Sequence, residues 1–356
     1  MAQPVAYLSQ IGNYTDYEED FPITNTSLFD LQVLIPVTII CIILFILGIT
    51  GNFMTILIFK RHKDMRTTVN MYLSSMALSD IFIFLGLPAD LYRIWKYKPY
   101  IFGDFLCKFF CYMSETYTYC TILHITTLSV ERYLAVCFPL RARIIITKGR
   151  VKGIIIFLWL FALLSAIPTL FLFGVEHRAG SSPEETMECK FMEHSAHTGL
   201  LKIMICVSTI YFFLPMFCLA LLYGLICRKL WMTRHGMRKP TTSTREKYHK
   251  PTIKMLAVVV MAFVLCWLPF HIGRILFAWT GIGQHMLYQV SQYLNLVSML
   301  LFYLSASINP VLYNIMSQKY RSAMCKILYH SQALQARNVT KSEPNSTEGT
   351  DVISSM

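Results

Sequence analysis

Seven long, mostly apolar stretches run through this sequence, and each is long enough to cross a lipid bilayer as a helix. A bilayer core is about 30 Å thick, so a spanning helix needs roughly 20 mainly apolar residues. Lipid cannot satisfy exposed backbone polar groups, so only helices and closed barrels cross it, and barrel strands would be short and alternating. The predicted spans are Val33–Phe59, Asn70–Ile94, Phe105–Cys137, Val151–Phe173, Leu200–Leu230, Thr252–Ala278 and Leu287–Met316. The sequence therefore predicts an all-α membrane protein, a seven-transmembrane helix bundle.

The composition agrees with a chain that is surrounded by lipid. Hydrophobic residues make up 55% of the 356 residues and charged residues only 15%, whereas average chains carry about 25% charged residues. Intrinsic disorder needs low hydrophobicity, and a disulfide scaffold needs a higher cysteine content than 11 in this length. The composition therefore excludes both of these classes.

The positive charge lies mainly in the loops on one side of the predicted spans. The loops after the first, third and fifth spans, and the segment after the seventh, are rich in Lys and Arg, and cytosolic loops carry such an excess. We therefore expect a plasma-membrane protein with its amino terminus outside the cell and its carboxyl terminus in the cytosol. The net charge of +12 then belongs to the cytosolic membrane face and does not indicate nucleic-acid binding.

This topology divides the chain into four segments. Residues 1–32 are predicted to form an extracellular tail glycosylated at Asn13 and Asn25, and they lack the basic and apolar regions of a cleaved signal peptide. Residues 33–316 form the bundle, residues 317–329 a short amphipathic eighth helix on the inner membrane surface, and residues 330–356 a disordered cytosolic tail. Cys325 on the eighth helix is either a palmitoylation site or a free thiol.

Two cysteines are predicted to lie on the oxidising side of the membrane. Cys107 opens the third span, and Cys189 lies in the longest outer loop. Disulfides persist in oxidising compartments, so we expect a Cys107–Cys189 bridge. Cys111, one helical turn from Cys107, is the competing partner.

Ionisable side chains inside the predicted spans indicate function, because such groups are costly in lipid. Those that we single out are Asp80, Asp90, Arg93, Glu115, Glu131, Arg132 and Arg274. Asp80 and Glu115 are too short to reach water from such depth, whereas Arg93 can extend to the interface. A transporter or channel would also use intramembrane charges, but it would usually show internal repeats, and the two halves of this sequence show none.

Short motifs in every span resemble those of the rhodopsin-like (class A) G-protein-coupled receptors. They are Gly51-Asn52, Leu78-Ser79-Asp80, Glu131-Arg132-Tyr133, Trp159, Pro215 with Tyr223, Cys266-Trp267-Leu268-Pro269 and Asn309-Pro310-Val311-Leu312-Tyr313. Each motif is weak alone, but together and in this order they are highly specific. The resemblance covers residues 33–330.

Longer stretches are similar to the motilin and ghrelin receptor group. They include Met65 to Thr68, Thr147 to Lys152 and Cys266 to Arg274. Within that group, Leu34 to Thr38 and Asp90 to Arg93 favour the motilin side, which is our first choice, and the short second outer loop favours the ghrelin side.

The resemblance implies a receptor and not an enzyme, and no HExxH or other catalytic pattern occurs. The implied partners are a peptide hormone outside, and a Gq-type heterotrimeric G protein, arrestin and receptor kinases inside, with membrane lipid around the bundle. The implied ligand-binding residues are Glu115, Arg274, Asp90, Arg93, Phe270, Gln292 and Phe302. Glu115 and Arg274 would form either hormone contacts or a purely structural ion pair. The implied switch and coupling residues are Trp267, Pro269, Glu131, Arg132, Tyr133, Tyr223, Asn309, Pro310 and Tyr313.

Two further expectations follow from the resemblance. Four residues resemble the sodium pocket of the family, for which a hydrated polar network is the alternative: Asp80, Thr121, Ser305 and Asn309. No other cofactor is expected.

Many relatives carry an acidic residue at the inner end of span six that pairs with the equivalent of Arg132, but this chain has His249 and Lys250 there. We therefore expect signalling without hormone, unless the nearby Glu246 substitutes.

Overall fold

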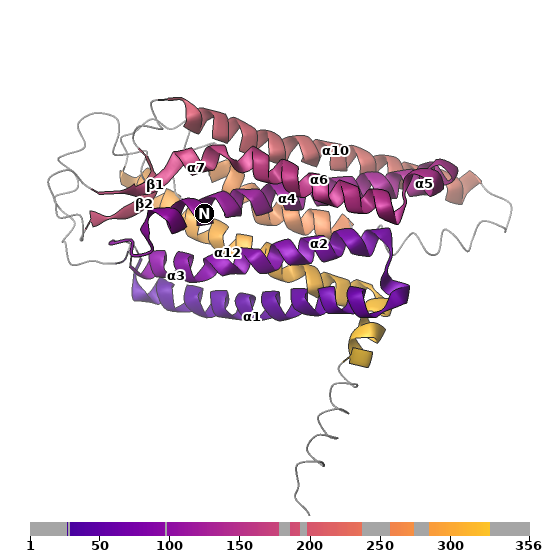
Figure 1. Ribbon diagram of the computed structural model, residues 1–356, viewed down its shortest axis with the longest axis horizontal. Coiled ribbons are helices and arrows are strands. Elements are labelled where there is room, and N and C mark those ends of the chain that lie inside the picture. The colour runs from indigo at the N-terminus through magenta and orange to yellow at the C-terminus, as the bar shows by residue number, and fades with distance from the viewer. Residues whose placement is uncertain are drawn as a thin grey trace, which may run out of the picture.

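The computed structural model of the chain describes residues 27, 29–96, 98–177, 186–192, 198–236, 257–273 and 285–327. The predictions at Asn13, Asn25, Arg274, His249 and Lys250 lie outside these residues, as does the predicted cytosolic tail. The described residues are mostly helical, and the long helices lie side by side as a bundle (Figure 1).

The helices begin and end close to the predicted limits. α1 covers Leu31–Arg61, α4 Gly103–Cys137, α10 Leu200–Gly236 and α12 His285–Met316, and a further helix covers Ala257–Gly273. Two other spans each contain two helices: α2 (Thr68–Ile83) with α3 (Leu87–Trp95), and α6 (Lys148–Ala166) with α7 (Pro168–Leu172).

These two divided spans correct the expectation of one continuous helix each. α2 passes through the 3₁₀ turn η3 (Phe84–Gly86) into α3, which carries Pro88 in its first turn. α7 likewise has Pro168 at its start. Proline has no backbone N–H to donate to the preceding helical turn, so the regular α-helical hydrogen bonding of each span is interrupted there. The predicted limit at Phe173 is also one residue too long, because Phe173 begins a strand.

Within the described part of the chain, five helical segments are long and apolar enough to cross a membrane. α4 is not among them, although it has 35 residues. It lies inside the bundle, in contact with α2, α6, α7 and α10. Its polar side chains are therefore shielded from lipid by other helices, which is where intramembrane polar groups are tolerated.

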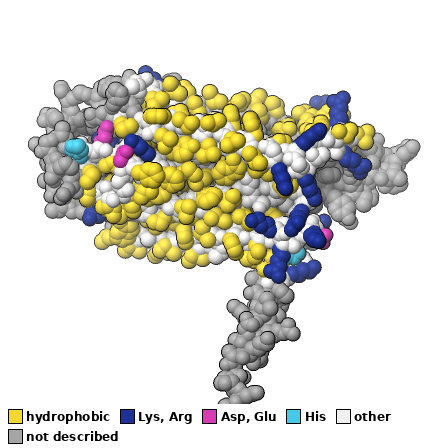
Figure 2. Space-filling model, viewed as in Figure 1, with side chains coloured by type: hydrophobic (Ala, Val, Ile, Leu, Met, Phe, Trp, Pro, Cys, Tyr) yellow, Lys and Arg dark blue, Asp and Glu magenta, His cyan; other side chains and the backbone are white. Residues whose placement is uncertain are grey.

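The outer surface of the bundle suits a bilayer. Figure 2 shows a broad band of hydrophobic side chains across the middle of the molecule, with most Lys and Arg side chains at the end opposite the β-strands. Large apolar side chains such as Ile42 on α1, Phe157 on α6 and Phe217 on α10 are exposed. Such a surface would be costly in water and is favourable in lipid.

Short elements close the two ends of the bundle. At one end lies an antiparallel hairpin of β1 (Phe173–Glu176) and β2 (Glu188–Phe191), which the sequence did not indicate. At the other end lie η2 (Lys63–Met65) and α5 (Pro139–Ile145). A short helix of residues 318–327 follows α12, where the eighth helix was expected. Its Tyr320 is buried, with its hydroxyl 2.8 Å from Thr55 Oγ1 of α1, and its place on a membrane surface stays a prediction.

Candidate functional site

A cavity lies beside α4 at the hairpin end of the bundle. Its lining combines polar side chains of α4 with aromatic side chains from β1 and the helix Ala257–Gly273: Cys111, Ser114, Glu115, Thr118, Phe173, Trp267 and Phe270. The four α4 residues are spaced by three and four positions, so they share one helix face. The site can therefore accept hydrogen bonds from a cationic group on one wall and bury an apolar group on the other. Of the predicted ligand residues, it brings together Glu115 and Phe270.

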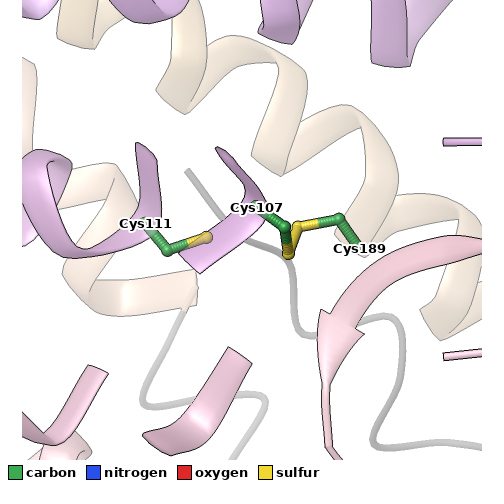
Figure 3. A group of neighbouring side chains, drawn as sticks. All are labelled: Cys107, Cys111 and Cys189. Atoms are coloured by element: carbon green, nitrogen blue, oxygen red, sulfur yellow. A yellow bond between two sulfur atoms is a disulfide. The ribbon is translucent and has the colours of Figure 1, made fainter. Parts of the chain in front are cut away.

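A disulfide joins the hairpin to α4 and confirms the predicted pairing. Cys189 of β2 is bonded to Cys107, and Cys111 is a free, buried thiol. The three sulfur atoms lie within 4.8 Å of one another, so Cys111 was a reasonable competitor (Figure 3). The bridge holds the hairpin next to the cavity, where Phe173 forms part of the wall.

Asp104, one residue before the predicted third span, is a second anchor for the hairpin. Its Oδ1 accepts from the backbone N–H of Val175 at 2.9 Å, and its Oδ2 pairs with Lys108 Nζ at 2.7 Å. Burial alone would raise the pKa of Asp104, but the hydrogen bonds from Lys108 and Val175 and the charge of Lys108 outweigh it and lower the pKa below its ordinary value of 3.8. The carboxylate is therefore charged at neutral pH and holds β1 to α4.

Asp90 and Arg93 form a separate polar group on α3. Arg93 Nη1 lies 4.0 Å from Asp90 Oδ1, and Tyr303 of α12 donates its hydroxyl hydrogen to Asp90 Oδ2 at 2.7 Å. Tyr303 is 1% exposed, so this bond crosses the packed interior. The sequence did not single out Tyr303, because no linear spacing relates it to Asp90.

Two other predicted ligand residues lie on α12. Phe302 packs edge-on against Trp267, with ring centroids 5.2 Å apart. Gln292 is buried, and its Nε2 has no hydrogen-bond partner among the residues that the structure describes. Arg274 lies outside those residues, so its predicted pairing with Glu115 stays a prediction.

Trp267 also lines a second cavity in the bundle. The second cavity is lined by Trp267 and by all four residues of the predicted sodium pocket: Asp80, Thr121, Ser305 and Asn309. Asp80 is 2% exposed and accepts from Asn309 Nδ2 at 3.0 Å. The lining offers one carboxylate together with hydroxyl and amide oxygens, which are the donors that a hard cation prefers.

The predicted coupling residues lie at the opposite end of α4. Arg132 Nη2 is 3.7 Å from Glu131 Oε2, and Glu131 Oε1 accepts from Tyr72 of α2 at 2.8 Å. Tyr72 was not identified from the sequence. Tyr223 of α10 has its hydroxyl 3.4 Å from Ser129 Oγ, one helical turn before Arg132.

The remaining predicted residues of this end lie on several elements. The Tyr133 ring meets Phe138 edge-on, and the buried Tyr313 hydroxyl has no hydrogen-bond partner in the described ranges. A Cβ at Gly51 of α1 would lie 2.9 Å from Pro310, so α1 and α12 approach closely there. Cys325, on the helix of residues 318–327, is exposed.

Comparison with known proteins places these features in one family. The family described as "7 transmembrane receptor (rhodopsin family)" matches residues 51–313. The chain is 51% identical over 340 residues to growth hormone secretagogue receptor type 1 of Mustela putorius furo, with 93% of each chain covered. It is 52% identical over 325 residues to the human receptor of that name, covering 91% of this chain and 89% of that receptor. It is 47% identical over 340 residues to the human motilin receptor, covering 84% and 82% respectively.

Proposed function

Because the chain belongs to the rhodopsin family of seven-transmembrane receptors, we propose that it binds a ghrelin-type or motilin-type peptide and activates Gq-type G proteins. Membership of this family makes the chain a multi-pass receptor of the plasma membrane and not an enzyme. The observation that carries the proposal is the cavity between α4, β1 and the helix Ala257–Gly273, with Glu115 on its wall.

Glu115 is the proposed contact for a cationic group of the hormone. It projects from the same α4 face as Ser114 and Thr118, so hydroxyl groups flank the carboxylate. A charge-assisted hydrogen bond in a site shielded from water is stronger than the same bond at a surface. Phe270 and Phe173 supply the apolar surface against which the neighbouring part of the peptide would pack.

A dose response to ghrelin and to motilin tests this proposal, with calcium release and inositol phosphate as readouts. Glu115→Gln should lower the potency of the active hormone at least tenfold, about 1.4 kcal/mol, while surface expression persists. Glu176→Gln is the matched control, because Glu176 lies on β1 beside Lys190, 3.6 Å away, and outside the cavity lining. Equal losses in both variants would mean that only the overall acidity of this end matters. The absence of a response to either peptide would refute the proposal that the ligand is a ghrelin-type or motilin-type peptide.

Different observations favour the two hormones. Motifs in the first two spans favour motilin, whereas the 52% identity to the human secretagogue receptor exceeds the 47% identity to the human motilin receptor. Identity averages over the whole chain, so ghrelin is the first peptide to test. A lower half-maximal concentration for motilin would reverse this order.

Trp267 and Pro269 are the proposed link between hormone and transducer. Trp267 lines both cavities, and Pro269, two residues on, removes a backbone hydrogen bond and permits a kink. A hormone that presses on Trp267 can therefore tilt the other end of this helix outward. Arg132, with Tyr223 nearby, would then meet the G protein. We also propose signalling without hormone, because His249 and Lys250 are not acidic and cannot form an ion pair with Arg132.

A sodium ion is the proposed occupant of the second cavity. Asp80 would supply the charge, and Thr121, Ser305 and Asn309 neutral oxygens. One carboxylate makes a weak cation site, so sodium would act as a modulator that favours one receptor state rather than as a structural ion.

The topology and the cytosolic partners complete the proposal. The crowding of Lys and Arg at the end opposite the hairpin supports a cytosolic location for that end (Figure 2). The hairpin and the glycosylated amino terminus would then lie outside. Arrestin and receptor kinases would act on the cytosolic side, and Cys325 would carry a palmitoyl group.

A further inference from the structure

Polar contacts join α2 to α4 along one face of each helix. Tyr72 Oη donates to Glu131 Oε1 at 2.8 Å, Ser75 Oγ lies 3.0 Å from His124 Nε2, and Ser79 Oγ lies 3.4 Å from Thr121 Oγ1. The three α2 residues are spaced by three and four positions, so they share one helix face. Of these three contacts, that of Tyr72 is made to a proposed coupling residue, Glu131.

The Glu131 carboxylate depends on this tyrosine. Glu131 is 5% exposed, and its Oε2 lies 3.7 Å from Arg132 Nη2, which is too far for a hydrogen bond. Neither Oε2 nor Arg132 Nε has a hydrogen-bond partner in the described ranges of the chain. The hydroxyl of Tyr72 therefore provides the hydrogen bond that the described residues give to this buried carboxylate.

The Tyr72 ring is itself held in place. It is 0% exposed and packs edge-on against His124, with ring centroids 6.1 Å apart. His124 Nδ1 lies 2.7 Å from the Cys120 carbonyl, which can only accept, so Nδ1 carries the hydrogen and Nε2 accepts from Ser75. Ser75 in turn accepts from Trp159 Nε1 of α6 at 2.9 Å. The His124 ring that packs against Tyr72 is thus itself held by contacts from α2, α4 and α6.

We propose that Tyr72 is a positioning residue for the coupling switch: its hydroxyl holds Glu131, and through Glu131 it holds Arg132, and so restrains signalling without hormone. This inference rests on the proposed role of Glu131 and Arg132. It places the restraint on α2 in a chain that has His249 and Lys250 at the inner end of span six. Without the hydroxyl, a buried carboxylate would have no hydrogen bond, which is costly. States in which Glu131 and Arg132 move toward the cytosol then become relatively more favourable.

The test is Tyr72→Phe, which removes the hydroxyl and keeps the packed ring. We expect inositol phosphate formed without hormone, per receptor at the cell surface, to rise about threefold, with the maximal hormone response retained. Tyr211→Phe is the matched control, since Tyr211 also joins two helices by donating to Ser165 Oγ at 2.6 Å, but from α10 to α6. It should leave the signal without hormone unchanged. In a Glu131→Ala background, which has no acceptor for the Tyr72 hydroxyl, Tyr72→Phe should add nothing further.

The outcomes separate this inference from the proposed function. If the wild type responds to hormone but Tyr72→Phe leaves the basal signal unchanged or lowers it, the inference is wrong. It is also wrong if Tyr72→Phe raises the signal as much in the Glu131→Ala background as in the wild type, or if Tyr211→Phe raises it as much as Tyr72→Phe does. A wild type that responds to no peptide refutes the proposed function instead. If Tyr72→Phe does not reach the surface, Ser75→Ala is the second test, because Ser75 holds the His124 ring that packs against Tyr72. A smaller rise in the signal without hormone agrees with the inference, and no rise overturns it.

Discussion

Gly48 of α1 leaves space for the ring of Phe84, and its replacement by alanine tests how closely these spans must pack. A Cβ at Gly48 would overlap the Cε2 and Cζ atoms of Phe84 and lie 3.1 Å from its Cδ2. Phe84 is 0% exposed, and its ring contacts those of Phe45 and Tyr303 at centroid distances of 5.8 and 5.6 Å. Gly48→Ala must therefore displace packed aromatic rings.

The expected magnitude follows from two opposing effects. Forcing an extra methyl group into a packed core costs about 1–3 kcal/mol of unfolding free energy. Replacing glycine by alanine inside a helix gains about 1 kcal/mol. Gly153 of α6 is the matched control, because a Cβ there would meet no atom within 4 Å among the described residues. The difference between the two variants cancels the helix effect and leaves the overpacking cost of about 1–3 kcal/mol.

Thermal unfolding of the purified receptor in detergent measures this difference. A thiol-reactive dye can report unfolding, because Cys41, Cys120 and Cys266 are buried in the folded chain. We expect Gly48→Ala to unfold at a lower apparent temperature than Gly153→Ala. Phe84→Leu removes the overlapping ring atoms, so it should destabilise the Gly48→Ala background less than the wild type. Equal unfolding temperatures of the two glycine variants, or additive effects with Phe84→Leu, would refute the reasoning.

Three further predictions concern polar contacts. The pKa of Asp104 is lowered, so its contribution to stability is present above pH 3.8 and is lost as the pH falls through the lowered value; hydrogen exchange of the Val175 amide should accelerate there, and in Asp104→Asn at neutral pH. Tyr303→Phe removes the 2.7 Å hydrogen bond to Asp90 and should reduce hormone potency several-fold, in dose-response curves matched for surface expression, if Asp90 contacts the hormone. Replacing sodium by a large organic cation should shift hormone potency in the wild type but not in Asp80→Asn, and the same shift in both would exclude the cavity around Asp80 as the site.

Hydropathy predicted the number and place of the spans well, because length and apolar content are local properties of the sequence. It did not predict where the regular helical hydrogen bonding of a span is interrupted. Pro88 and Pro168 were visible, but an apolar run continues through both of them. It also could not show why α4 tolerates so many polar residues, since that depends on which helices surround it.

The site was predicted in part, and the missing residues share a cause. Glu115 and Asp80 were singled out because a charge inside an apolar run is unusual on its own, whereas Thr121, Ser305 and Asn309 came only from the family resemblance. Tyr72 and Tyr303 were missed because their significance lies in partners that are 59 and 213 residues away in sequence. A tyrosine within an apolar span looks like an ordinary packing residue until the carboxylate opposite its hydroxyl is known.

α4 carries residues of the proposed hormone site, the proposed sodium site and the proposed G-protein contact, which restricts how the receptor can transmit a signal. Cys107 ties one end of α4 to the hairpin, Glu115 lines the first cavity, Thr121 lines the second, and Arg132 lies near the other end. A continuous helix rises about 1.5 Å per residue and does not shorten, and the disulfide prevents the Cys107 end of α4 from moving away from the hairpin. We therefore expect the movement to occur mainly in neighbouring helices, and Pro269 gives one of them a point at which to bend. On this view α4 is the fixed element, and its contacts with α2 and with Trp267 determine how readily the others move past it.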